Sequence, residues 1–227
     1  AKRSDREAKE GVIIAKTTAD HKTGFVVCIA CETDFVSKNA AFVAFAQSIA
    51  DAAVANNVKS SEELNAVSIN GITVADMIND KLASIGEKIS VAKFERLDAP
   101  FVASYIHGAN RMGVLVALTA EAAELGKDLA MQIAAMNPVA VDADSVPAET
   151  VARERAIIID TMKEDPKMAG KPEEMIVKIA EGKIAAFFKE QTLLAQSFVK
   201  DGSKTVGDHV KSVGDIKVTE FKRVALG

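Results

Sequence analysis

The chain has 227 residues, of which 48% are hydrophobic, and a formal net charge of −4 at pH 7. This length is sufficient for one large domain or two small ones with apolar cores. The acidic balance and the absence of lysine or arginine runs argue against a nucleic-acid groove, so we expect no direct nucleic-acid partner. No apolar run approaches the roughly 20 residues that cross a bilayer, and we find no secretory leader. We therefore expect a cytoplasmic protein with no membrane partner.

The first half of the chain contains a strand, strand, helix, helix, strand pattern. Apolar segments from Val12 to Ala15 and from Phe25 to Ala30 predict two strands. An apolar helix follows from Asn39, and Thr73-Val74-Ala75-Asp76 predicts a shorter helix capped by its threonine. The alternation of apolar and polar residues from Gly86 to Leu97 predicts a third strand with one buried face.

The second half repeats this order. Apolar segments lie at Phe101 to Tyr105 and at Gly113 to Leu118, and an apolar helix around Leu129 follows them. Thr205-Val206-Gly207-Asp208 matches the earlier helix start, and Val213 to Val224 matches the earlier third strand. We therefore predict an α+β fold with two related lobes, each a three-stranded antiparallel sheet with helices on one face.

An insertion interrupts the second copy. Pro147 and Pro172 each predict the first turn of a helix, and Asp165-Pro166 separates the two, which gives an antiparallel helical hairpin or coiled coil. Its apolar stripes either bury each other, or their surplus residues Ile157, Ile159 and Phe188 mark a homodimer contact. The predicted parts are a linker or helix (1–10), a core N-subdomain (11–98), a core C-subdomain (99–145 and 192–227) and the inserted hairpin (146–191).

Cys28-x-x-Cys31 raises a redox or metal-binding interpretation. Both cysteines lie on a predicted strand, where a spacing of three places them on opposite faces. A redox pair sits at a helix N-terminus, and a zinc site needs a second cysteine pair. We interpret them as two buried structural thiols.

The three histidines are far apart in the sequence, and the chain lacks the common hydrolase, zinc and nucleotide-cradling motifs. We therefore predict no catalytic residue, no metal ligand and no cofactor. Among the histidines, His107 stands out because it lies in a predicted hairpin turn, where functional residues are frequent.

Thr33-Asp34-Phe35 follows the predicted strand directly, at a junction that is normally polar. Either Thr33 caps a helix while Phe35 packs inward, or Phe35 is presented to another protein. Ile85 before Gly86 is typical of a helix that ends with a glycine.

Four segments together resemble the bacterial translation elongation factor Ts family. They are Cys31-Glu32-Thr33-Asp34-Phe35-Val36-Ser37-Lys38, Ile85-Gly86-Glu87, Ser104-Tyr105-Ile106-His107-Gly108 and Lys204-Thr205-Val206-Gly207. The similarity runs from about Gly11 to Val224. The family normally begins with a small helical domain, and the resemblance leads us to expect that this sequence lacks that domain and starts in the linker that follows it.

The resemblance implies a guanine-nucleotide exchange factor that binds the GTPase elongation factor Tu and is not an enzyme in the bond-making sense. In the family, Asp34 and Phe35 would intrude beside the partner's magnesium ion and help to dislodge it. The partner-binding residues that the resemblance implies are Thr33, Asp34, Phe35, Val36, Ile85 and His107.

Two functions from other classes remain open on the residues alone. A thiol oxidoreductase would use Cys28 and Cys31, and a structural scaffold would dimerise through the hairpin at 146–191.

Overall fold

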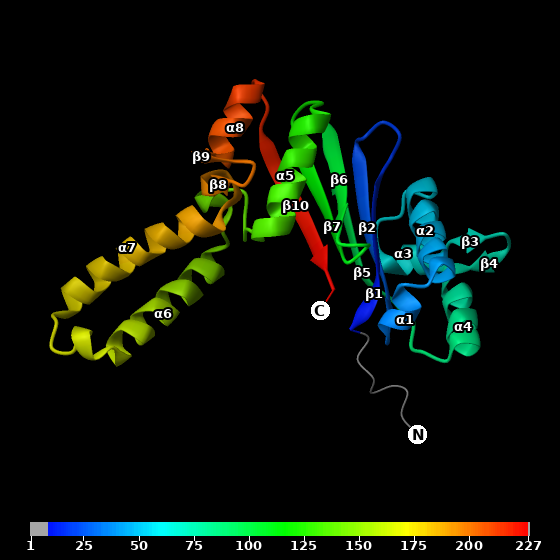
Figure 1. Ribbon diagram of the computed structural model, residues 1–227, viewed down its shortest axis with the longest axis horizontal. Helices are drawn as coiled ribbons and strands as arrows, with labels where there is room; N and C mark the ends of the chain where they lie inside the picture. Colours follow the sequence, from blue (N-terminus) through cyan, green and yellow to red (C-terminus); the bar gives the residue numbers. More distant parts are fainter. Residues whose placement is uncertain (1–8, 227) are drawn as a thin grey trace. The chain divides into compact units, whose positions relative to one another are not determined.

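The computed structural model describes residues 9–226 and has the predicted α+β fold (Figure 1). The chain divides into two compact units, the first formed by residues 1–135 and 216–227 and the second by residues 136–215. Most of the predicted linker or helix at 1–10 lies outside the described residues. The predicted subdomain boundaries stay predictions.

The first unit contains an antiparallel sheet in the order β1-β2-β5. Four helices and a two-stranded hairpin cover one face of it, where their apolar side chains form a core with those of the sheet (Figure 1). The elements are β1 (Glu10–Thr17), β2 (Thr23–Cys31), α1 (Asp34–Ser37), α2 (Ala40–Ala55), α3 (Ser61–Ala66), β3 (Ser68–Ile69), β4 (Ile72–Thr73), α4 (Val74–Ile85) and β5 (Ser90–Asp98).

A second antiparallel sheet of the same unit has the order β10-β7-β6 and carries α5. Gly126 of α5 approaches this sheet so closely that an added Cβ would lie 2.5 Å from the Cβ of Ala103. The elements are β6 (Phe101–His107), β7 (Met112–Leu118), α5 (Ala123–Met136) and β10 (Val218–Ala225).

The two sheets share a detail that the sequence repeat alone does not reveal. In the pairing of β5 with β2, Ala92 is an extra residue, because Lys93 pairs with Cys28 and Val91 pairs with Ile29. In the pairing of β10 with β7, Thr219 is the corresponding extra residue. A β-bulge at the same position of both copies supports a duplicated unit, because bulges bend and twist a strand at defined places.

The faces of the sheets that the helices do not cover contact each other through a second apolar core. An added Cβ at Gly24 would lie 2.7 Å from Val102 Cγ1, and one at Gly113 would lie 2.9 Å from Ile13 Cγ2. Burial on both faces explains why β2 is a continuous apolar run rather than an alternating one. The predicted helix-covered face is present in each copy, and the sheet-to-sheet contact was not predicted.

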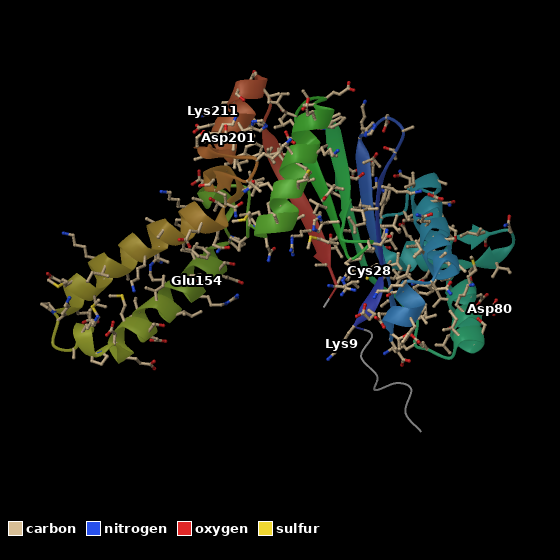
Figure 2. The ribbon with its side chains drawn as sticks, viewed as in Figure 1. Lys9, Cys28, Asp80, Glu154, Asp201 and Lys211 are labelled. Carbon is tan, nitrogen blue, oxygen red and sulfur yellow. The ribbon has the colours of Figure 1, made fainter. Side chains whose placement is uncertain are left out.

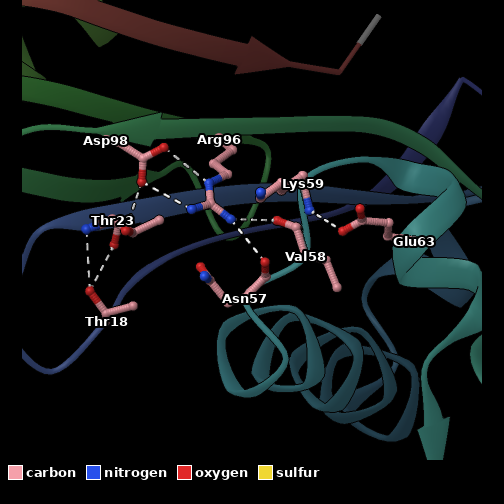
Figure 3. Close-up of polar contacts among 8 residues, drawn as sticks. All are labelled: Thr18, Thr23, Asn57, Val58, Lys59, Glu63, Arg96 and Asp98. Atoms are coloured by element: carbon pink, nitrogen blue, oxygen red, sulfur yellow. Dashed lines mark hydrogen bonds and ion pairs between the residues drawn. The ribbon is translucent and has the colours of Figure 1, made fainter.

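Arg96 of β5 ties the end of α2 to the first sheet (Figure 3). Its Nη1 donates to the carbonyls of Asn57 (2.9 Å) and Val58 (3.0 Å), and its Nε donates to Asp98 Oδ2 (3.1 Å). The guanidinium also lies over the ring of Phe25, 5.5 Å from its centroid. The two carbonyls belong to the loop that follows α2, so Arg96 fixes that loop on the first sheet.

The second unit contains the predicted helical hairpin (Figure 1). Pro147 and Pro172 are the N-caps of the two hairpin helices, directly before the first turns in which the sequence predicts them. Arg155 and Glu181 form an ion pair between these helices, at 2.9 Å. Across residues 9–226, no helix combines the length and apolar character needed to cross a membrane. The elements of the unit are α6 (Ala148–Glu164), α7 (Glu173–Gln191), β8 (Ser197–Phe198), β9 (Asp201–Thr205) and α8 (Val206–Val213).

Candidate functional site

The β2–α2 junction, residues 32–39, presents an aromatic side chain to solvent. Phe35 is 87% exposed, the largest exposed fraction among the large hydrophobic residues of the described chain. The local alternative, in which this ring packs inward, is therefore wrong. A solvated phenylalanine has no stabilising role in the free protein, which is typical of a residue that contacts a partner.

Phe35 lines a pocket of about 300 Å³ at the surface of the first unit. Ile85, the last residue of α4, lines the same pocket and is 37% exposed. The fold thus brings together two residues that lie far apart in the sequence. The lining of this junction pocket consists of Phe35, Val36, Asn39, Ala41, Phe42, Lys81 and Ile85.

Polar contacts within the junction fix its backbone. Thr33 is the N-cap of α1, and its Oγ1 accepts a hydrogen bond from the Val36 amide at 3.4 Å. Asp34 is exposed and pairs with Lys38 four residues later, at 3.3 Å. The predicted cap is confirmed, whereas the inward packing predicted with it is not.

Glu87, which lies between α4 and β5, also binds this junction. Its Oε1 accepts hydrogen bonds from the amides of Glu32 and Thr33, both at 3.0 Å. Its Oε2 accepts the hydroxyl of Thr33 at 2.7 Å. Sequence reasoning missed this role, although Glu87 belongs to the Ile85-Gly86-Glu87 turn that carries part of the family resemblance.

Lys81 is a further residue that the sequence did not single out. It lines the junction pocket, and its Nζ lies 5.2 Å from the ring centroid of Phe45. Its position one turn before Ile85 on α4 could have indicated a shared face, because residues four apart on a helix are neighbours.

His107 ends β6 and is exposed, and its Nδ1 lies 2.9 Å from the hydroxyl of Tyr105. It is not among the residues that line the junction pocket. The β6–β7 turn is nevertheless bonded to the neighbouring sheet, because Arg111 pairs with Glu10 at 3.0 Å. Glu10 is also the β1 residue that lies opposite Cys31, the last residue of β2, in the antiparallel strand pairing.

The two cysteines are buried and free, and they lie on opposite faces of β2, as predicted (Cys28 is labelled in Figure 2). Burial raises the pKa of Cys28 to about 11, although the charge of Lys93 lowers it. Burial, followed by the charges of Glu87 and Glu10, raises the pKa of Cys31 to about 12. Both are therefore protonated thiols at neutral pH, which does not support a redox function.

Comparison with known proteins gives a consistent result. Residues 32–227 match the family model described as "Elongation factor TS". The chain is 43% identical over 231 residues to a protein of Christiangramia forsetii named "Elongation factor Ts", covering all of this chain and 82% of that protein. A protein of the same name from Flavobacterium psychrophilum is 44% identical with the same coverage. One from Methylococcus capsulatus is 43% identical, covering all of this chain and 76% of the relative.

Proposed function

The chain belongs to the elongation factor Ts family, whose members are translation elongation factors, and on this premise we propose that it is a guanine-nucleotide exchange factor for elongation factor Tu. It would bind the GDP-bound GTPase, displace Mg²⁺ and promote GDP release. The proposed activity belongs to the cytoplasm, the compartment of bacterial translation.

The observation that carries this proposal is the exposure of Phe35 beside a pocket that Ile85 also lines. An aromatic ring on a fixed backbone can enter an apolar pocket of a partner with little loss of conformational freedom. Such buried anchors contribute about 2–4 kcal/mol to binding.

Asp34 supplies the charge that this mechanism needs. Its side chain is 51% exposed, and its ion pair with Lys38 joins two solvent-facing groups. Exposed ion pairs are weak and exchange readily for other partners. In the complex, Asp34 would act on partner groups near the ion, while Phe35 occupies the neighbouring apolar space.

Displacement of Mg²⁺ explains how a small intrusion releases a tightly bound nucleotide. The ion neutralises phosphate charge, so a shift of its ligands removes much of the binding free energy of GDP. A weakening of about 10³-fold corresponds to about 4 kcal/mol of coupling. Linkage requires the factor to prefer the nucleotide-free GTPase by the same amount. No covalent step is needed, so we propose that the protein is not an enzyme in the bond-making sense.

Thr33, Val36, Ile85 and His107 complete the proposed contact surface. Thr33 fixes the junction, whereas Val36 and Ile85 extend the apolar surface around Phe35. His107 would form a separate contact from the β6–β7 turn, outside the junction pocket.

The test is the release of fluorescently labelled GDP from elongation factor Tu, with the unmodified chain compared with Phe35→Ala and Asp34→Ala. We expect Phe35→Ala to reduce the stimulated rate by about 30-fold or more, because loss of an anchor costs about 2 kcal/mol or more. Asp34→Ala should reduce it less, by about tenfold, the size of a typical single polar contact of about 1.4 kcal/mol.

Met131→Ala provides the matched control, since Met131 is a 38% exposed apolar residue on α5 and lies outside the proposed surface. This variant should stimulate release like the unmodified chain. Equal stimulation by all four proteins would show that Asp34 and Phe35 do not have the proposed roles.

A further inference from the structure

We infer that Glu87 is a positioning residue for nucleotide exchange, which holds the β2–α2 junction in the conformation that presents Asp34 and Phe35 to the partner. This inference rests on the proposed function, because it assigns to Glu87 the control of the proposed contact residues. Glu87 itself does not line the junction pocket, so its effect is exerted through the junction.

The geometry of the carboxylate supports this role. One oxygen accepts two consecutive backbone amides, those of Glu32 and Thr33, and the other accepts the hydroxyl of Thr33. All three donors belong to the junction. Glu32 and Thr33, which carry them, precede Glu87 in the sequence by 55 and 54 positions. Hydrogen bonds to a charged group are stronger than those between neutral groups.

Thr33 connects the Glu87 carboxylate to the first turn of α1 through its hydroxyl group. Its Oγ1 donates to Glu87 and at the same time accepts from the amide of Val36, in the first turn of the helix that contains Phe35. The hydroxyl proton is committed to Glu87, so the oxygen lone pair faces the amide. Truncation of the Glu87 side chain leaves the Thr33 hydroxyl without this partner, and the first turn of α1 loses its fixed cap.

The turn that carries Glu87 also carries Ile85. Between them, Gly86 adopts a left-handed conformation (φ +81°), which closes α4 with a bond from its amide to the carbonyl of Leu82 at 2.8 Å. One turn therefore directs Ile85 to the junction pocket and Glu87 to the junction backbone. Glu87 thereby fixes the position of Phe35 relative to Ile85, the other apolar residue of the proposed contact.

Two substitutions separate the positioning role from a general loss of stability. Glu87→Ala removes all three acceptor contacts. Glu87→Gln keeps an oxygen that can accept both amides, and its NH2 group can donate to Thr33 Oγ1 and hold that oxygen in place, so it should rescue most of the function. Glu121→Ala is the matched control, because Glu121 is an exposed carboxylate of the same unit, before α5. Circular dichroism melting curves establish that each variant is folded.

The first measurement is amide hydrogen exchange by NMR on the full chain without its partner. We expect the Glu32 and Thr33 amides to exchange at least about tenfold faster in Glu87→Ala, the factor that corresponds to about 1.4 kcal/mol of lost protection. The amide of Ile29, within β2, should exchange as in the unmodified chain. Unchanged exchange of Glu32 and Thr33 would overturn the restraint itself.

The second measurement is stimulated GDP release from elongation factor Tu. Glu87→Ala should reduce stimulation about tenfold, because the junction must then be ordered during binding. Glu87→Gln should stay within about threefold of the unmodified chain, less than about 1 kcal/mol. In a background that carries both Asp34→Ala and Phe35→Ala, Glu87→Ala should have little further effect, because it acts through these two side chains.

Three results of this second measurement would overturn the inference: full activity of Glu87→Ala, a loss in Glu87→Gln as large as in Glu87→Ala, or a further loss when Glu87→Ala is added to Asp34→Ala and Phe35→Ala. A different result would show that the proposed function itself is wrong. The unmodified chain would then not stimulate release at all, whatever hydrogen exchange shows at Glu32 and Thr33.

Discussion

Phe35 is held at the surface by the hydrogen bonds of its neighbours and not by contacts of its own ring. Thr33 contributes a hydroxyl that is donor and acceptor at once, and Glu87 contributes both of its carboxylate oxygens. The exposed aromatic ring is therefore attached to a backbone that side-chain hydrogen bonds hold at Glu32, Thr33 and Val36. Such an arrangement lowers the entropy that binding would otherwise have to remove.

The thiols Cys28 and Cys31 should be almost inert in the folded protein. Their pKa values of about 11 and about 12 lie above the ordinary value of 9.0 because both side chains are buried. At about pH 8 the thiolate fraction is then roughly 10²- to 10³-fold lower than for a free cysteine, and burial restricts access further. Reaction with Ellman's reagent should be slow and become rapid in denaturant. Rapid labelling of the native chain would restore the oxidoreductase interpretation.

The helix caps can be predicted from the sequence because they depend only on neighbouring residues. The caps Thr33, Thr73 and Thr205 follow from spacing, and each accepts the amide three residues later, as predicted. The exposure of Phe35 does not follow from the local residues, since the same Thr-Asp-Phe segment also suits inward packing, and only the family resemblance implied it. The contact with Glu87 could not be predicted, because it depends on the return of the chain after α4.

Arg96 links three elements through one side chain, because it satisfies carbonyls after α2, pairs with Asp98 on β5 and covers Phe25 of β2. Its side chain is 16% exposed, so its bonds are shielded more than those of a surface pair. This link fixes α2 on the first sheet, and α2 contributes Phe42 to the junction pocket.

Arg96→Met should lower the free energy of unfolding by about 1–3 kcal/mol, because two carbonyls lose their donor. Arg96 also holds the pKa of Asp98 below its usual value of 3.8. This contribution is present above pH 3.8 and is lost as the pH falls through the lower value of the folded state, so the difference between the two proteins should narrow in acid. Urea unfolding at neutral pH and below pH 3.8 measures both effects.

Arg153→Met, an exposed position on α6, is the control for the loss of a guanidinium. It should change the free energy of unfolding by less than about 0.5 kcal/mol. The interpretation of Arg96 would be incorrect if both variants unfolded at the same urea concentration as the unmodified chain.

The helical hairpin shows what the periodicity of apolar residues can predict about two packed helices. Met162 of α6 and Ile184 of α7 are buried apolar residues of the hairpin. Of the surplus residues, Ile157 is 52% exposed, whereas Ile159 and Phe188 are half-buried. The sequence pattern identifies the faces that two neighbouring helices bury, but it does not identify a further partner. Homodimerisation through this hairpin stays a prediction.

The duplicated sheets form the framework of the first unit. The repeat in the sequence predicts two similar sheets, and the matching bulges at Ala92 and Thr219 agree with it. Their face-to-face packing could not be predicted, because an apolar run such as β2 also suits a strand that is covered by helices alone. Packing on both faces fixes β2, whose end leads directly into the junction with Phe35. A contact residue is placed most accurately when rigid elements support it.

The central claim is a coupling between two binding events, so the most direct test measures that coupling. Isothermal titration would give the affinity of the unmodified chain for nucleotide-free elongation factor Tu and for its GDP-bound, Mg²⁺-bound form. We predict tighter binding to the nucleotide-free form by about 10³-fold, which is about 4 kcal/mol, and a clearly smaller ratio for Phe35→Ala. Equal affinity of the unmodified chain for the two forms would contradict the account, since a factor with no preference cannot promote release.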